Sequence, residues 1–212
     1  MPNPRSGNEF KIRVFYEWLN RRPHAINAMI PKQGYGAIIG IEHANSAIYG
    51  EFDYTRISTD MFLNISPIDD MPVALFARLK TISVIGDNIP SQDLPAITNN
   101  SPIYLMGQNV LGIHEAIHLR GWNDWRIGDK LVYGTIEPRI GGNQFVLACY
   151  VDFGNVWYSD GEVREMLYTG GYELRINLGL VVLSYGAAQD FNRWKNNNSP
   201  YNYLQMALVN PF

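Results

Sequence analysis

Residues Phe145–Trp157 read FVLACYVDFGNVW, and apolar side chains occupy every second position from Phe145 to Phe153. Period-two alternation is the pattern of a β-strand whose two faces meet different surroundings. Asp152 and Gly154 fall on the face opposite this apolar row. A charged side chain that faces lipid costs up to about 2–4 kcal/mol at the bilayer midplane, with acids at the lower end. If the strand crosses a membrane, Asp152 therefore has to face a water-filled interior.

The same alternation recurs along most of the chain, in segments separated by turn residues. Segments of this kind are typical of membrane β-barrels, whose strands need about 9–11 residues each. The pattern predicts about nine antiparallel strands and no helix, within one barrel domain over residues 1–212. The expected strands cover residues 10–18, 35–44, 56–65, 73–80, 131–140, 145–157, 172–178, 181–185 and 203–212. Residues 86–130 break the rhythm, so we expect one long loop there, at about 88–129, without strands of its own.

Composition and charge narrow the classes of protein that fit this pattern. The chain has 212 residues, of which 17% are charged, whereas soluble domains have roughly 25%. A net charge of −3 gives no electrostatic case for binding nucleic acid. The single cysteine, Cys149, excludes an internal disulfide and any multi-cysteine metal site. We expect no cofactor, and because no run of about 18 apolar residues occurs, no membrane-spanning helix.

The first residues, MPNPRSG, lack the apolar core of a secretory signal. A protein of the outer membrane has to be exported. We therefore infer that this sequence is a mature, truncated or partial chain, and the alternative is a cytosolic protein.

A soluble β-sandwich or small barrel would also alternate apolar and polar faces. Strands of soluble proteins cluster near 5–6 residues, whereas several segments here keep phase for longer. Aromatic residues also gather at the segment ends, as in the interfacial girdles of a membrane barrel. They are Tyr16, Trp18, Tyr35, Phe52, Tyr54, Trp157, Tyr158, Tyr172, Tyr185, Tyr201 and Tyr203. Length and aromatic placement together favour the membrane barrel.

Several short motifs resemble those of one family. His118-Leu-Arg-Gly-Trp122, in the expected long loop, resembles the Arg-Gly-aromatic motif of the outer-membrane assembly and two-partner-secretion superfamily, also called the bacterial surface antigen family. The stretch 128–139, the segment 151–157 with its aspartate and glycine two apart, and the stretch 171–186 look like the strands that follow that loop. The chain ends on Phe212, like many outer-membrane proteins. The resemblance covers roughly residues 35–212.

The resemblance implies a barrel that inserts other barrels into the outer membrane of a Gram-negative-type bacterium, or translocates polypeptides through it. In that family the loop folds back into the barrel. The implied loop-to-wall site contains Arg120, Gly121, Trp122, Asp152, Gly154 and Glu137. A guanidinium can hold a carboxylate at two points, so we expect Arg120 to bond to Asp152, with Glu137 as a second partner. We also expect Arg120 to be what approaches the wall at Gly154. Phe212 is implied to be part of the assembly signal.

Family barrels have sixteen strands, so nine imply the carboxy-terminal part of a larger barrel. Open strand edges in hydrocarbon leave unpaired backbone groups at several kcal/mol each. Either upstream strands are missing, a second chain completes the barrel, or about eight strands close into a small one. In that family periplasmic domains precede the barrel, and we expect none within residues 1–212. The expected partners are outer-membrane lipid and unfolded outer-membrane polypeptides, and we expect no enzymatic activity.

Two alternative functions remain open. A passive pore or scaffold barrel would share the architecture without insertase activity. A soluble β-sandwich zinc hydrolase would use His114-Glu-Ala-Ile-His118, which matches the His-Glu-x-x-His pattern. That zinc signature needs a helix to place both imidazoles on one face, and the helical pattern is absent here.

Overall fold

One large antiparallel sheet dominates the fold. The computed structural model describes residues 5–21, 33–66, 72–98, 104–105, 108–109, 116–179, 181–192 and 200–208. Nine strands pair in the order β1-β2-β3-β4-β10-β11-β12-β13-β14, and every pairing is antiparallel. They are β1 Lys11–Arg21, β2 Gln33–Ala44, β3 Asp53–Ile65, β4 Val73–Asn88, β10 Lys130–Gly141, β11 Phe145–Trp157, β12 Leu167–Asn177, β13 Val181–Asp190 and β14 Tyr201–Leu208. The predicted all-β antiparallel fold and the predicted nine strands are confirmed.

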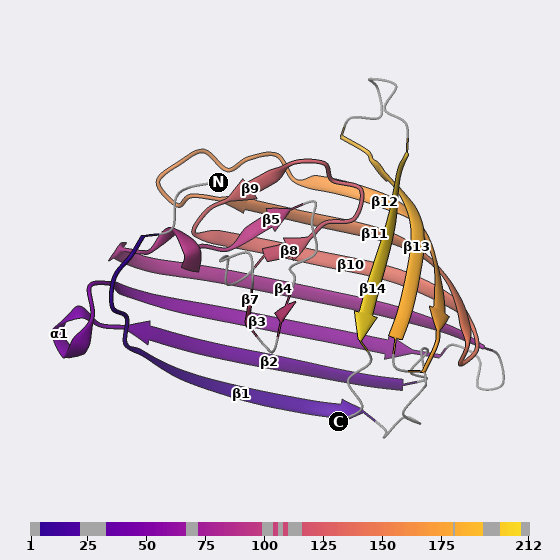
Figure 1. The fold of residues 1–212 in the computed structure, drawn as a ribbon, viewed down its shortest axis with the longest axis horizontal. Coiled ribbons are helices and arrows are strands. Elements are labelled where there is room, and N and C mark those ends of the chain that lie inside the picture. Colours follow the sequence, from indigo (N-terminus) through magenta and orange to yellow (C-terminus); the bar gives the residue numbers. More distant parts are fainter. Residues whose placement is uncertain are drawn as a thin grey trace.

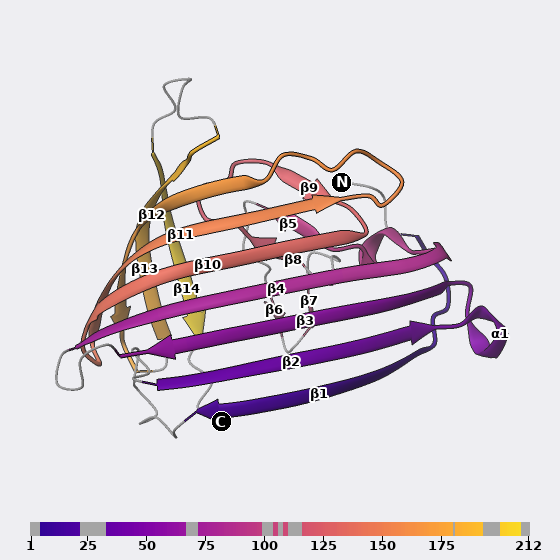
Figure 2. The same ribbon diagram turned by 180° about the vertical axis from the view of Figure 1, so that it is seen from behind.

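The sheet curls into an open trough and its two edges are not paired with each other (Figures 1 and 2). The alternation of β11 follows this curvature, since Cys149 and Val151 are exposed on the convex face while Asp152 is fully buried on the concave face. Such alternation places the polar residues of each strand in the trough.

Several strand ends differ from the prediction. β4 runs on to Asn88, β12 begins at Leu167 and not at residue 172, and β13 continues to Asp190. Gly170 and Gly171 are typical of a turn, but here they lie within β12. The phenyl ring of Phe191 covers Gly170, and the backbone of β13 lies close to Gly171. The glycines therefore serve close packing and do not end the strand.

The chain between β4 and β10, residues 89–129, is called here the insert. Its described parts contain η1 Ser91–Asp93 and the short strands β5 Ala96–Thr98, β6 Tyr104–Leu105, β7 Gln108–Asn109, β8 Ala116–His118 and β9 Trp125–Ile127. Strands β8, β5 and β9 form a small sheet in which β5 and β8 are parallel. The prediction of a loop without strands was therefore wrong. Strands of two or three residues are too short to produce an alternation that can be recognised in the sequence.

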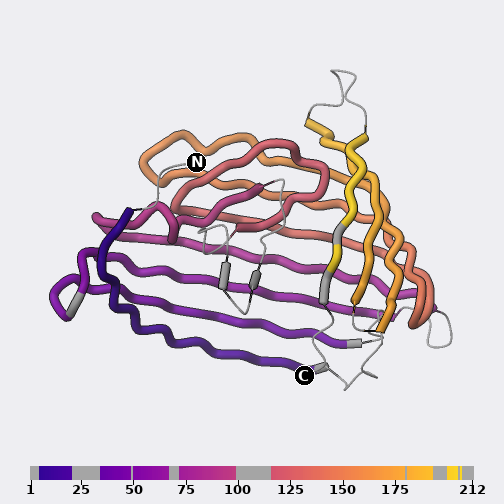
Figure 3. Tube along the Cα trace, in the orientation of Figure 1, coloured from indigo at the N-terminus to yellow at the C-terminus, as the bar shows by residue number. Residues whose placement is uncertain are grey.

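The small sheet of the insert and the turn that follows β8 lie in the trough, against the inner wall formed by β4, β10 and β11 (Figure 3). Ile97, Leu119 and Trp122 of the insert belong to one buried cluster with wall residues such as Ile82 and Val156. The insert thus has an apolar contact with the wall as well as the polar contacts described below.

Helices are few and short. The helix α1, Ser46–Tyr49, joins β2 to β3, and the side chain of Asn45 caps it by accepting a hydrogen bond from the amide of Ala47 at 2.8 Å. Within the described ranges, no helix combines the length and apolar character needed to cross a bilayer.

The close packing at Gly171 gives a first test. In the variant Gly171→Ala the new methyl would lie 2.1 Å from the carbonyl oxygen of Ala187. We expect a loss of about 1–3 kcal/mol in unfolding free energy, as for other overpacked sites. Gly142→Ala is the matched control, because nothing lies within 4 Å of a Cβ there. The unfolding temperature of each variant can be measured as the temperature at which the protein loses its folded mobility on a gel in detergent. Equal unfolding temperatures for Gly171→Ala and Gly142→Ala would contradict the packing argument.

Candidate functional site

A tight turn at residues 119–122 carries the arginine predicted to face the wall. The amide of Leu119 donates to the carbonyl oxygen of Thr98 at 3.2 Å, and the amide of Trp122 donates to the carbonyl oxygen of Leu119 at 3.1 Å. Gly121, at the third position of this turn, has φ +84°, the backbone conformation that a type II turn requires there. A Cβ on Gly121 would also lie 2.6 Å from Cβ of Ala188 in β13. The turn is therefore pressed against the wall.

Arg120 meets the wall through all three of its guanidinium nitrogens. Its Nε donates to Oδ2 of Asp152 at 2.8 Å and its Nη2 donates to Oδ1 at 2.6 Å, a two-point pairing. Nη1 donates to Oε2 of Glu137 at 2.8 Å, and Nη2 also donates to Oγ1 of Thr135 at 3.0 Å. The register of β10 and β11 sets Thr135 directly opposite Asp152. Two neighbouring strands thus present one prepared site for the guanidinium.

Below the guanidinium plane lies the ring of Tyr150, with its centroid 3.5 Å from Cζ of Arg120. Planar stacking on an aromatic face is a contact that arginine can make and lysine cannot. Burial by itself lowers the pKa of Arg120, but hydrogen bonding and charge from Asp152, with charge from Glu137, raise it above its ordinary value. The cation is therefore retained at any physiological pH.

A second layer of charge surrounds this pair. Glu137 also accepts from Arg139 at 2.5 Å and pairs with Arg175 at 2.8 Å. Arg175 donates to Glu173 at 2.6 Å, and Glu173 lies 3.5 Å from Arg120. Three arginines thus interlock with three carboxylates. Because the charges balance within the cluster, each buried ion has a counter-charge to offset its lost hydration.

Two tyrosines join this charge cluster to the last strand. Tyr203 of β14 donates to Oε2 of Glu173 at 2.8 Å, and its hydroxyl oxygen lies 3.0 Å from the hydroxyl of Tyr150, from which it can accept. The ring of His118, in β8 of the insert, meets the ring of Tyr203 edge-on at 6.4 Å between centroids. The cluster therefore connects the insert to strands β10, β11, β12 and β14. The remaining strand, β13, contacts the insert at Gly121.

The structure brings together Arg120, Asp152 and Glu137, but it places Gly154 differently from the expectation. The side chain closest to Gly154 is Ile97 of β5, whose Cδ1 would lie 2.8 Å from a Cβ there, with Leu119 next among side chains at 3.7 Å. Arg120 instead reaches Asp152, one inward position away along β11. The expectation that Arg120 approaches the wall at Gly154 was wrong, because the apolar side of the insert covers that position.

Trp122 is a packing residue of the insert. It is buried in the apolar cluster on the wall, and the guanidinium of Arg126 lies over its ring at 5.2 Å. The prediction for Phe212 falls outside the described residues, as do His114 and Glu115 of the possible zinc motif. His118 lies in the strand β8. Among the described residues, no group of three or more His, Cys, Asp or Glu side chains is arranged to hold a metal ion.

Sequence reasoning missed a second polar attachment of the insert, at the edge strand β1. Nζ of Lys11 lies 2.7 Å from Oδ1 of Asp93 in η1 and 2.9 Å from Glu9. Asp93 is only 1% exposed. Arg5 exchanges two hydrogen bonds with Gln92, through its amide at 3.1 Å and its carbonyl oxygen at 3.0 Å. The insert is thus tied to β1 as well as to β11.

The Arg120 attachment predicts a local effect on the insert. Arg120→Met leaves buried carboxylates without their shared cation, a loss of about 3–5 kcal/mol that water in the trough would reduce. We expect faster hydrogen exchange in residues 116–129 while the large sheet stays folded. Arg78→Met is the control, since Arg78 pairs with Asp60 at 2.5 Å but is 40% exposed, where such pairs contribute about 0–1 kcal/mol. Equal exchange of the insert in both variants would rule out this attachment.

The two attachments should act independently, because they share no residue. Asp93→Asn weakens the contact with Lys11, so we expect faster exchange in residues 91–98 and little change at the Arg120 turn. In the double variant with Arg120→Met, the stability losses should add to within about 0.5 kcal/mol. Hydrogen exchange with mass spectrometry gives the local stability of the insert in the unchanged protein, in the two single variants and in the double variant. A large departure from additivity would mean that the two contacts form a single unit.

Comparison with protein-family models and with curated proteins found no match for the sequence. Among solved structures, the fold is similar to that of BamA from Haemophilus ducreyi lacking POTRA domains 1–3, with a TM-score of 0.71 at 12% sequence identity. The match covers 93% of this chain and 42% of that one, so the chain spans about two fifths of the length of that structure. At this identity the likeness concerns the fold alone. The chain therefore has the antiparallel fold of part of a BamA-type β-barrel.

Proposed function

We propose that this chain forms part of an integral outer-membrane β-barrel that inserts or translocates outer-membrane polypeptides. The observation that carries the proposal is the turn at Arg120, held by the buried carboxylates of Asp152 and Glu137 inside a sheet of BamA-type fold. No step that makes or breaks a covalent bond is assigned to any residue. The proposed activity depends on the wall, the insert and the strand edges.

The convex face supports a location in lipid. Large apolar side chains stand exposed there on several neighbouring strands, whereas soluble monomers rarely expose contiguous apolar patches larger than about a few hundred Å². Examples are Ile39, Ile41, Ile57, Met61, Leu63, Ile136, Leu147, Val151, Tyr172 and Leu174, all at least 40% exposed. The buried charged side chains of the same strands lie on the opposite, concave face: Glu42, Arg56, Glu137, Asp152 and Glu173. Lipid would cover the apolar rows, as in other membrane barrels.

Connection lengths support one orientation in the membrane. The insert, by far the longest connection, leaves the sheet at the end where β1 begins. The tight turn of residues 142–144 lies at the other end, as do the end of β12 and the start of β13, which are separated by only three residues in the sequence. Outer-membrane barrels have short periplasmic turns and longer extracellular loops. We therefore place the insert end outside and the tight-turn end in the periplasm.

In the proposed activity, the insert is the segment that moves relative to the wall. Its contacts combine ion pairs at Arg120 and Lys11 with one apolar cluster around Trp122. Buried ion pairs can exchange partners only if another charge takes the place of the one that leaves, and charged groups of a passing polypeptide would provide it. The insert could thus loosen from the wall without unfolding the large sheet.

A passive pore or scaffold barrel is the second candidate. The charged inner wall suits it, because the lumen of a pore is polar. It needs no movement of the insert, so variants that loosen the insert should leave its function intact. The zinc hydrolase hypothesis depends on His114 and Glu115, which lie outside the described residues, and a metal analysis of the purified protein decides it.

Insertion of a test barrel into liposomes separates the first two candidates. We expect the chain, reconstituted in its native assembly, to accelerate folding of the test barrel. Arg120→Met should reduce that rate several-fold, whereas Arg78→Met should leave it near the starting value. Proteoliposomes that leak small solutes but never accelerate folding would favour the passive pore. The fraction of folded protein, measured by heat-modifiable mobility, has to be equal in all samples.

A further inference from the structure

The direction of the edge strands decides what can complete this sheet. β1 and β14 are the two ends of the nine-stranded order, and each pairs on one side only within the described residues. Because neighbours alternate in direction and the number of strands is odd, β1 and β14 run the same way. Joining them directly would create a parallel seam. A closed antiparallel barrel therefore needs an odd number of additional strands.

A second copy of the chain does not meet this requirement. Copies inserted into a membrane in the same orientation would place β14 of one beside β1 of the other, and these strands are parallel. An antiparallel contact between two β1 strands needs one copy turned upside down in the bilayer. The strand that covers the edge of β1 must therefore come from something other than an equally oriented copy.

Side chains of β1 are unusually open on both faces. On the convex side Val14 is 67% and Tyr16 68% exposed, and on the concave side Phe15 is 64% exposed. Comparable values occur on β14, where Leu204 is 71% exposed. In the middle of the sheet, Leu147 and Val151 are 46% and 45% exposed. The excess at the edges is the area that a neighbouring strand would cover.

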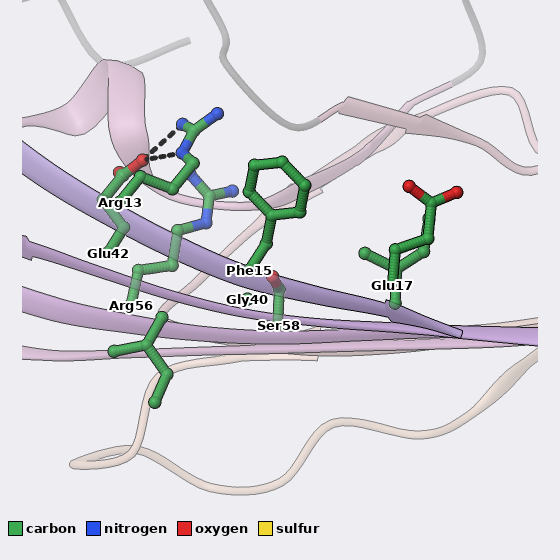
Figure 4. A pocket seen from close by; sticks show the side chains of 9 residues that line it. Arg13, Phe15, Glu17, Gly40, Glu42, Arg56 and Ser58 are labelled. Carbon is green, nitrogen blue, oxygen red and sulfur yellow. Dashed lines mark hydrogen bonds and ion pairs between the residues drawn. The ribbon is translucent and has the colours of Figure 1, made fainter. Parts of the chain in front are cut away.

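A pocket of about 260 Å³ opens on the concave face beside this edge (Figure 4). The pocket is deep at Gly40, which has no side chain, and at Ser58, whose side chain is small. The ring of Phe15 stands at its side. Arg13 at one end is already engaged by Glu42, whose Oε2 accepts from Nε at 2.7 Å. All of the pocket's lining residues belong to β1, β2 and β3, and none to the described part of the insert.

Glu17 stands at the opposite end of the pocket and points the same way as Phe15 (Figure 4). None of the hydrogen bonds and ion pairs found among the described residues involves its carboxylate, in contrast with Glu42 of the same pocket. A carboxylate at the rim of a partly apolar pocket selects a cation on an adjoining strand. Lysine and arginine also have stems long enough to lie along the side of Phe15.

We propose that the free edge of β1 and this pocket bind one strand of defined direction and chemistry. The bound strand runs antiparallel to β1, from the tight-turn end towards the insert end. It carries apolar side chains on the convex face, and on the concave face a lysine or arginine opposite Glu17. It belongs to a β-element with an odd number of strands. This surface does not depend on insertase activity, because an open edge in lipid has to be covered in any membrane barrel.

Cysteine crosslinking tests the direction in the full chain, held in detergent micelles. The background is Cys149→Ala, with either Ile12→Cys or Asn20→Cys in β1. The probe is a peptide of about ten residues that alternates valine with threonine, has one inward lysine, and carries a cysteine at one end. A carboxy-terminal cysteine should crosslink to Ile12→Cys, and an amino-terminal cysteine to Asn20→Cys. The reverse pattern, equal crosslinking of both, or no binding overturns the proposal.

Charge selection is tested with the same peptide. Glu17→Gln should weaken binding of the lysine peptide about two- to fivefold, as for a partly exposed ion pair. A peptide with leucine in place of lysine should bind both forms equally. Glu162→Gln, at an exposed loop carboxylate, is the matched control and should change neither affinity. A loss that is the same for both peptides would show that Glu17 supports the fold and does not select a cation. Liposome insertion is not part of this test, so its result is separate from that of the proposed function.

Discussion

A guanidinium buried against a β-sheet is strongly destabilising unless carboxylates balance its charge. The pairing of Arg120 with Asp152 meets that condition. The remaining features of the site follow from it. Gly121 lets the turn come close enough to β13, and Thr135 and Glu137 take up the remaining donors. Arg139 and Arg175 in turn neutralise the extra carboxylate charge. Without Arg120, Asp152 would be a buried carboxylate with no cation beside it, and Glu137 would lose one of its three arginine partners.

The sheet could be read from the sequence because its strands are long and alternate for most of their length. β11 is the clearest case, with apolar residues outward and Asp152 inward. The pairing of Arg120 with Asp152 came from a family resemblance and not from periodicity. In residues 172–178, Glu173 and Arg175 alternate with Tyr172, Leu174 and Ile176, but only the register of β12 on β11 shows which inward charges meet. Register depends on side-chain contacts across strands, and one sequence does not state them.

Two features of the insert could not have been predicted by the same reasoning. Its strands β5, β8 and β9 have three residues each, so no periodic signal develops. The contact of Lys11 with Asp93 joins residues 82 positions apart, and each residue alone looks like an ordinary solvated charge. Ile97 at Gly154 is a similar case, since a glycine indicates a close approach but not what approaches.

The hydroxyl of Tyr203 has a bearing on the order in which this protein assembles. It lies on β14 and contacts Glu173 and Tyr150, so the floor beneath the arginine is complete only after β14 has joined the sheet. Contacts between residues distant in the chain form late, because closing long loops costs entropy before any bond compensates it. The turn at residues 119–122 meets Asp152 and Glu137 of β11 and β10 directly, whereas Glu173 gains its tyrosine partner only from β14. The charged interior therefore reaches its full set of bonds only when β14 is in place.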